Sequence, residues 1–216
     1  MSGMNPELDF WAGAGGDAYQ RRNAVTDTEV KQRATSLGRI LWTPSVGLGP
    51  SSLILEVGAG PGSNLRALKM CDFTNLYAVE PNATARAVLA TILSSERVYD
   101  GHTGAIPAAD GTFDLVMTAG VLIHVHPDRL RDCMVEIARV SRRYVLAIEY
   151  FAPTCEPVVY YGAERIWRND FGKLYLDFGL QRVSNGFFWK QADEGYDNTV
   201  WTLLEKPVGW RADEVT

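Results

Sequence analysis

The sequence predicts an α/β protein with a Rossmann-like, doubly wound and mostly parallel sheet of seven strands that ends in an antiparallel hairpin. Short apolar runs alternate with amphipathic helical segments between residues 53 and 178, a pattern typical of parallel strands joined by helices on both faces of a sheet. Further along, two apolar runs are joined only by the polar segment KQADEGYDN, which indicates a hairpin. The chain of 216 residues is long enough for one such domain and a small appendage.

The predicted elements begin with a helix at residues 26–41. Thr26 can cap its first turn, and Glu29 lies three residues later, as in a capping box. A connector rich in Gly, Pro and Ser at 44–52 leads to the first strand. Pro81 is expected to begin the helix after the second strand, because proline suits a first turn. The predicted strands are 53–57, 75–79, 97–99, 113–118, 144–149, 183–189 and 199–205, and the further helices are 64–70, 81–93, 127–140 and 165–178.

The composition is that of an ordinary globular protein. Hydrophobic residues make up 46% of the chain, and the net charge of -5 gives no electrostatic footprint for nucleic acid. Three cysteines without CxxC spacing indicate reduced thiols, and the N-terminus lacks the features of a signal peptide. We expect a cytoplasmic monomer or homodimer that binds a small molecule and neither nucleic acid nor membrane. Its expected parts are an N-terminal lid or helical segment at 1–48, a main domain at 49–206 and a tail at 207–216.

A glycine-rich loop, LEVGAGPG at residues 55–62, follows the first strand and precedes a helix. Its glycines allow a tight turn and the close approach of a ligand. Glu80 ends the second strand, where a carboxylate can accept hydrogen bonds from both hydroxyls of a ribose. A dinucleotide site is one alternative, but Pro61 fits poorly against a pyrophosphate and Glu56 would repel it. Glu56 instead favours a cation, such as the ammonium or sulfonium group of S-adenosylmethionine (SAM).

Four segments in order resemble the class I SAM-dependent methyltransferases: LEVGAGPG, VEP at 79–81, IPAADGTFDLV at 106–116 and VLIHV at 121–125. The resemblance implies a class I methyltransferase fold, with SAM as cofactor and S-adenosylhomocysteine (SAH) as product. It implies that the first loop holds the methionine part of SAM, that Glu80 holds the ribose and that His102 contacts the adenine. The implied cofactor residues are Tyr19, Arg22, Glu56, Gly58, Ala59, Gly60, Asn64, Glu80, Pro81, His102, Thr103, Thr118, Ala119 and Gly120.

The N-terminal segment WAGAGGDAYQRRN, residues 11–23, is also glycine-rich but follows no predicted strand. It is interpreted either as a flexible surface segment or as a lid with its glycines as hinges, and the lid is favoured. It resembles the W-x-G-x-x-G-x-x-Y-x-x-R-N box of the pseudaminic acid biosynthesis-associated methylase family, as do GSNLRAL at 62–68 and the D-x-T-x-W-x-L-L-E-K end at 197–206. The matching residues of the box are Trp11, Gly13, Gly16, Tyr19, Arg22 and Asn23.

The acceptor of a methyl group on oxygen or nitrogen must lose a proton, so a nearby base assists the transfer. His124, after the fourth strand, is the first candidate, with packing against the following helix as the alternative. Glu149 and Tyr150 end the fifth strand and are expected to face the active-site crevice as catalytic residues. His126 is interpreted as a helix cap, and no metal site is expected. The residues expected to bind the acceptor are Trp11, Asn23, His124, Tyr150, Trp167, Arg168 and Asp170, with a helix cap as the alternative for Asp170.

These observations predict a SAM-dependent methyltransferase that acts on an O or N atom of a small molecule. The narrower resemblance implies a sugar or sugar nucleotide as the acceptor, in the biosynthesis of surface glycans or a related pathway. The alternatives are another natural product or metabolite as the acceptor, a SAM-binding protein without catalysis, and an NAD-dependent oxidoreductase on the same fold.

Overall fold

The computed structural model describes residues 5–192 and 194–215. The ends of the expected N-terminal segment and tail, and Asp193 of the expected polar turn, lie outside the described residues. The strands are β1 (Leu53–Val57), β2 (Asn75–Val79), β3 (Val98–Tyr99), β4 (Phe113–Ala119), β5 (Ser141–Glu149), β6 (Glu156–Tyr160), β7 (Ala163–Arg168), β8 (Gln181–Phe188) and β9 (Thr199–Glu205). The α-helices are α1 (Pro6–Ala12), α2 (Ala14–Arg22), α3 (Asp27–Leu41), α4 (Ser63–Met70), α5 (Ala83–Leu89), α6 (Pro127–Val140) and α7 (Phe171–Asp177).

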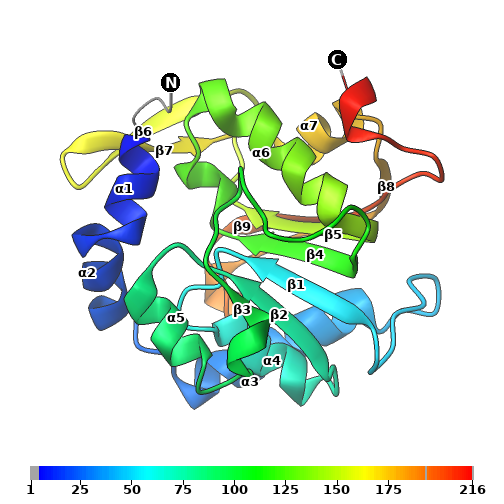
Figure 1. The fold of residues 1–216 in the computed structure, drawn as a ribbon, viewed down its shortest axis with the longest axis horizontal. Helices are drawn as coiled ribbons and strands as arrows, with labels where there is room; N and C mark the ends of the chain where they lie inside the picture. The colour runs from blue at the N-terminus through cyan, green and yellow to red at the C-terminus, as the bar shows by residue number, and fades with distance from the viewer. Residues whose placement is uncertain (1–4, 193, 216) are drawn as a thin grey trace.

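Seven of the strands form one sheet in the order β3-β2-β1-β4-β5-β9-β8. The strands β1 to β5 pair in parallel, whereas β9 is antiparallel to both β5 and β8. The helices α3, α4 and α5 cover one face of this sheet, and α6 and α7 cover the other (Figure 1). The predicted sheet with its C-terminal antiparallel hairpin is therefore confirmed.

The central strands are mainly apolar because both of their faces are buried. Ile54 of β1 packs with Leu37 and Leu65 on the side of α3 and α4, and the next residue, Leu55, packs with Met134 on the side of α6. Successive strand residues point to opposite faces, so a strand between two layers of helices needs apolar residues at most positions. This arrangement explains the continuous apolar runs of the sequence.

The predicted helix at 165–178 is wrong in its first half. The chain there forms a separate antiparallel hairpin of β6 and β7, and only α7 is helical. Tyr161 and Gly162 form the two-residue turn, and both have positive φ angles, 52° and 75°, as a type I′ hairpin turn requires. The β-branched pair Val158–Val159 and the glycine in the turn are the sequence signals for this hairpin.

The helix α5 begins later than predicted. Asn82 caps it by accepting the N–H of Ala85 at 2.9 Å, so Pro81 precedes the helix and does not form its first turn. The cap at α3 agrees with the sequence, because the Thr26 side chain accepts the N–H of Glu29 at 3.2 Å. Both caps satisfy N–H groups that a helix start leaves without a partner.

The N-terminal segment forms two helices, α1 and α2, that meet at Gly13. Gly15 and Gly16 lie inside α2, where they permit close packing. A Cβ atom on Gly15 would lie 2.5 Å from the Phe10 ring, and one on Gly16 would lie 2.0 Å from the Trp11 carbonyl oxygen. Glycine is thus required there by contact between the two helices.

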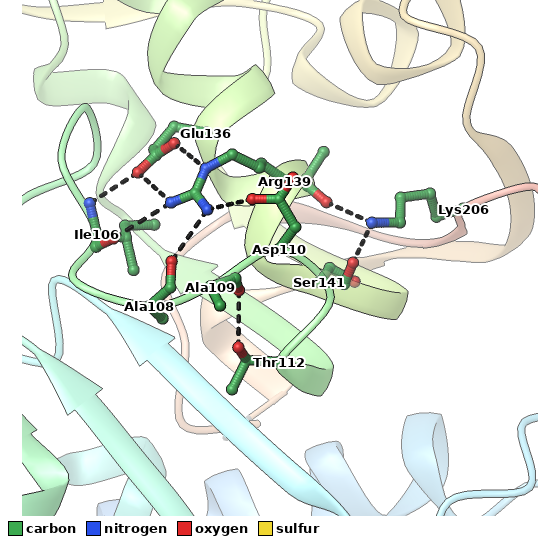
Figure 2. Close-up of polar contacts among 10 residues, drawn as sticks. Ile106, Ala108, Ala109, Asp110, Thr112, Glu136, Arg139, Ser141 and Lys206 are labelled. Atoms are coloured by element: carbon green, nitrogen blue, oxygen red, sulfur yellow. Dashed lines mark hydrogen bonds and ion pairs between the residues drawn. The ribbon is translucent and has the colours of Figure 1, made fainter. Parts of the chain in front are cut away.

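The connection between β3 and β4 is fixed to α6 by Arg139 (Figure 2). Its guanidinium donates to Glu136 at 2.6 and 2.9 Å, to Asp110 at 2.6 Å and to the Ala108 carbonyl at 2.9 Å. Glu136 in turn accepts the backbone N–H of Ile106 at 2.9 Å. This network positions the segment that follows β3. Within the part of the chain that the structure describes, no helix is long and apolar enough to cross a membrane.

Candidate active site

A cavity of about 880 Å³ lies at the carboxyl ends of β1, β2 and β4, between the sheet and the helices α1 and α2. In a parallel sheet this is the edge at which ligands bind. Its lining joins the glycine loop after β1 to the N-terminal helices. The sequence-predicted site residues that line it are Trp11, Tyr19, Arg22, Asn23, Glu56, Gly58, Ala59, Gly60, Asn64, Glu80, Pro81, His102, Thr103, Ala119, Gly120 and His124.

The glycine loop needs glycine for two physical reasons. Gly58 and Gly60 have positive φ angles of 70° and 51°, which side-chain-bearing residues rarely adopt. A Cβ atom on Gly58 would also lie 2.7 Å from Val121 Cγ2. The loop therefore passes close to the segment after β4 and leaves its backbone exposed to the cavity.

Glu80 is 6% exposed and is oriented by two backbone donors. The N–H of Gly60 donates to Oε2 at 2.8 Å, and the N–H of Asn82 donates to Oε1 at 2.9 Å. Burial raises the pKa of this carboxyl above its usual value. Each carboxylate oxygen has a further lone pair, so Glu80 can accept two hydrogen bonds from a pair of ligand hydroxyls.

Glu56 is the second buried carboxylate of the cavity. Its Oε1 accepts a hydrogen bond from Asn64 Nδ2 at 2.6 Å, while its Oε2 is buried without a hydrogen-bond partner. Burial raises the pKa of Glu56 to about 7. A buried oxygen without a partner is costly, so this position favours a ligand that brings a donor or a positive charge.

Two residues around Asn64 were not expected from the sequence. Arg33 of α3 donates to Asn64 Oδ1 at 2.7 Å, and the Tyr196 hydroxyl from the loop before β9 donates to the same oxygen at 2.8 Å. The Arg33 guanidinium also stacks on the Tyr196 ring at 4.5 Å. Both residues line the cavity, so α3 and the loop between β8 and β9 close its end beside Glu56.

His124 ends the short 3-10 helix Leu122–His124 and is oriented by two neighbours. Its Nδ1 lies 3.2 Å from the Arg165 carbonyl oxygen, and its ring lies 4.3 Å from the Trp11 ring. Burial lowers the pKa of His124 to about 4, so the imidazole is neutral at physiological pH. Donation from Nδ1 to a carbonyl selects the tautomer that leaves the Nε2 lone pair available as a base.

Glu149 and Tyr150 do not face the cavity as expected. Glu149 is 2% exposed and accepts the backbone N–H groups of Val121 at 3.0 Å and Leu122 at 3.2 Å. The hydroxyl of Tyr150 donates to Asp197, which itself lines the cavity. Thr118 is fully buried and does not line the cavity either. These residues lie behind the wall of the cavity and support it.

The three residues expected to bind the acceptor near α7 are also outside the cavity lining. Trp167 packs its ring against His126 at 5.1 Å, and Arg168 pairs with Glu156 at 3.2 Å. Asp170 caps α7 by accepting the N–H of Lys173 at 2.9 Å, which is the alternative considered for it. These three side chains are therefore held by contacts outside the cavity: Arg168 within its own hairpin, Trp167 at His126 and Asp170 at the start of α7.

Arg22 carries an uncompensated positive charge at the cavity. It donates to the Tyr160 hydroxyl at 2.9 Å, and its guanidinium lies 5.8 Å from the centre of the Tyr19 ring and 5.3 Å from that of Tyr161. No carboxylate of the described residues lies within ion-pair distance of it. The hairpin of β6 and β7 and the helix α2 thus hold a guanidinium that can bind an anionic ligand group.

Comparisons with known proteins agree with the fold. Residues 55–146 match a family model described as a methyltransferase domain, whereas a comparison with curated proteins found no match. Among solved structures, a 1,6-didemethyltoxoflavin-N1-methyltransferase from Burkholderia thailandensis, with its substrate and SAH bound, has a TM-score of 0.69 at 16% identity, and the alignment covers 93% of this chain and 86% of that chain. Magnesium protoporphyrin IX methyltransferase from Synechocystis PCC 6803, with bound SAM, has a TM-score of 0.68 at 15% identity, with 96% and 100% covered.

The cyclase SpnF also shares the fold, with a TM-score of 0.60 at 15% identity and with 91% of this chain and 84% of that chain covered. The fold by itself therefore does not decide the reaction. SAM, the cofactor predicted from the sequence, is the cofactor of the class of methyltransferases that have this domain and fold. Residues 55–146 are thus similar to a methyltransferase domain, and the chain has the fold of the SAM-dependent methyltransferases among these solved structures.

Proposed function

We propose that this protein transfers the methyl group of SAM to an oxygen or nitrogen atom of an anionic small molecule. The observation that carries the proposal is a pair of buried carboxylates, Glu56 and Glu80, at the ends of two adjacent parallel strands in one cavity. The glycine loop lies between them in the sequence. SAM presents an ammonium group and a ribose diol, which are the groups that such carboxylates bind.

The end of the cavity beside Glu56 fits the methionine part of SAM. The Glu56 Oε2 atom has no hydrogen-bond partner and can accept from the ammonium group. The positive charge would lower the pKa of Glu56 from about 7 and favour its ionised form. Asn64 and Arg33 would orient this end, because they fix the other carboxylate oxygen through a chain of hydrogen bonds.

The end beside Glu80 fits the ribose and the adenine. Glu80 is held by backbone N–H groups and has lone pairs left for the two ribose hydroxyls. His102 and Thr103, which line the cavity after β3, would contact the adenine. The same pair of carboxylates counts against NAD, because Glu56 would repel a pyrophosphate placed over the glycine loop.

When bound, SAM supplies an electrophilic methyl group, and the protein has to position the acceptor and exclude water. The neutral His124, with its Nε2 lone pair, would take the proton that an O–H or N–H acceptor loses. The Trp11 ring packs on the imidazole and keeps it from rotating. The backbone from Ala119 to Gly120, which lines the cavity at the end of β4, would face the methyl group.

The acceptor that Arg22 favours carries a phosphate or carboxylate. The guanidinium is held by aromatic rings and a hydroxyl, so it keeps its full charge for a ligand. A sugar nucleotide has this chemistry and agrees with the narrower family resemblance of the sequence. Other anionic metabolites are the second candidates, and a cytoplasmic location and a role in biosynthesis stay predictions of the sequence.

The proposal is tested in two steps. Calorimetric titration with SAH and NAD should show SAH binding, and binding of NAD without SAH would contradict the assignment. Transfer of tritiated methyl groups from SAM into a panel of sugar nucleotides, free sugars and neutral metabolites then identifies the acceptor. We expect labelled anionic products, and replacing Arg22 with methionine should raise the KM for them with little change in SAH affinity. Label only in neutral acceptors would contradict the role of Arg22.

A further inference from the structure

Asn82, two residues after Glu80, is bound to the N-terminal helices. The Asn82 side chain is 1% exposed, and its Nδ2 donates to Asp17 Oδ1 at 3.0 Å. The same nitrogen lies 3.3 Å from the Gly13 carbonyl oxygen and 3.4 Å from that of Ala12. The backbone N–H of Asn82 donates to Glu80 at 2.9 Å. One residue therefore joins Glu80 to the junction of α1 and α2.

The helix α2 lies directly against this residue. A Cβ atom on Gly16 would be 2.8 Å from Asn82 Nδ2, so a side chain there could not be accommodated without a shift. One helical turn after Gly16, on the same face of α2, comes Gln20. The close contact between Gly16 and Asn82 thus fixes how near α2, and with it Gln20, lies to the glycine loop.

Gln20 reaches the cavity over Gly60. Its Nε2 is the nearest side-chain atom to the position of a Cβ on Gly60, at 3.8 Å. Its Oε1 is buried and has no hydrogen-bond partner. Gln20 lines the cavity, and Gly60 is the residue whose N–H donates to Glu80. A buried amide oxygen without a donor is costly, and a ligand in the cavity can supply that donor.

We propose that Gln20 is a cofactor-binding residue and that Asn82 is the positioning residue that holds it in place, so that SAM and the N-terminal helices stabilise each other. The amide oxygen of Gln20 accepts from a ribose hydroxyl or from the ammonium group of the methionine part of the bound cofactor. This inference rests on the proposed function, because SAM supplies the donor. Binding of the cofactor and docking of α2 are then linked, and each strengthens the other.

Calorimetric titration with SAH separates this inference from the proposed function. Gln20→Leu keeps the size of the side chain and removes its acceptor, and we expect at least a tenfold rise in Kd, whereas Gln20→Glu retains an acceptor and binds more tightly than Gln20→Leu. The matched control is Gln181→Leu on the exposed start of β8, which should bind SAH as the wild type does. The apo form of Gln20→Leu should unfold at the wild-type temperature or higher, because it loses an unpartnered polar atom.

Hydrogen exchange in residues 6–22, with and without SAH, tests the link to the helices. SAH should slow exchange in α2 of the wild type, and Asp17→Ala, which removes the Asn82 contact from the helix side, should speed exchange and weaken SAH binding together. Wild-type affinity in Gln20→Leu, or exchange in α2 that does not respond to SAH, overturns the inference. Failure of the wild type to bind SAH at all would instead contradict the proposed function.

Discussion

Glu149 lies beneath the loop after β4, and its carboxylate accepts the backbone N–H of Val121 at 3.0 Å. The sequence places Glu149 at the end of a strand that leads into the cavity, yet its side chain holds the wall of the cavity from behind. Because this carboxylate is buried, its pKa is raised to about 7, and its ionisation is coupled to the shape of the loop.

The first prediction concerns pH and Glu149. The folded protein binds this proton more tightly than the unfolded chain does, so the contribution of Glu149 to stability is full below about pH 4.5 and is lost as the pH rises through 7. Relative to the wild type, Glu149→Gln should therefore gain up to about 3 kcal/mol of unfolding free energy between pH 5 and pH 8. Urea unfolding at both pH values measures this, with the exposed Glu164→Gln as the control. If the unfolding free energies of Glu149→Gln and the wild type differ by the same amount at both pH values, the pKa of Glu149 is not raised in the folded protein.

The second prediction concerns His124. Burial lowers its pKa to about 4, so between pH 5 and pH 8 the ring is neutral and should produce no change in kcat/KM. Its nuclear magnetic resonance signals should titrate well below the usual range of histidine. His124→Gln should lower kcat about 100-fold or more if the ring is the base. Titration of the ring near pH 6.5, or wild-type turnover in the variant, would remove His124 from this role.

The third prediction concerns the hydroxyl of Tyr196. It donates to Asn64 Oδ1 at 2.8 Å inside the protein. Tyr196→Phe should lower the free energy of unfolding by about 1 kcal/mol, since one buried hydrogen bond is lost, and should weaken SAH binding because Asn64 is no longer fixed. Tyr161→Phe, at an exposed ring in the β6–β7 turn, is the control for stability. A stability equal to that of the control would show that the bond contributes nothing.

The fourth prediction concerns the packing of α1 on α2. Gly16→Ala places a methyl group 2.0 Å from the Trp11 carbonyl oxygen, which is backbone and cannot rotate away. We expect a loss of about 1–3 kcal/mol in unfolding free energy, as for other overpacked sites. Gly49→Ala, where nothing lies within 4 Å of the new Cβ, should be close to neutral. A wild-type melting temperature for Gly16→Ala would mean that the two helices separate freely.

The sheet and most of its helices could be predicted because their signals are local. The strand β1 is a continuous apolar run, and α6 repeats its buried residues at helical spacing. The helix expected at 165–178 joins the end of β7 to α7, two short elements with only two residues between them. The acceptor residues expected there, Trp167, Arg168 and Asp170, lie at the end of β7 and before α7, outside the cavity lining.

The part of the cavity that could be predicted comes from segments with recognisable sequence motifs. The glycine loop and Glu80 are set by the alternation of strand and helix, and both line the cavity as expected. Arg33, Tyr196 and Gln20 come from three other segments, and only tertiary packing brings them to that loop. Glu149 shows a different limit, because a strand position does not tell whether a carboxylate points into a cavity or under its wall.

The β6–β7 hairpin lies between β5 and α7, and in the described residues it forms its own two-stranded sheet beside the main one. It orients His124 through the backbone carbonyl of Arg165, which every amino acid would provide. The exposed side chains of the hairpin, such as those of Val159 and Glu164, can therefore change without disturbing the tautomer of the imidazole, whereas Ile166 and Trp167 are held by packing against the core. Under the proposed function, variation at these exposed positions would change the acceptor, while the residues proposed to bind SAM would stay the same.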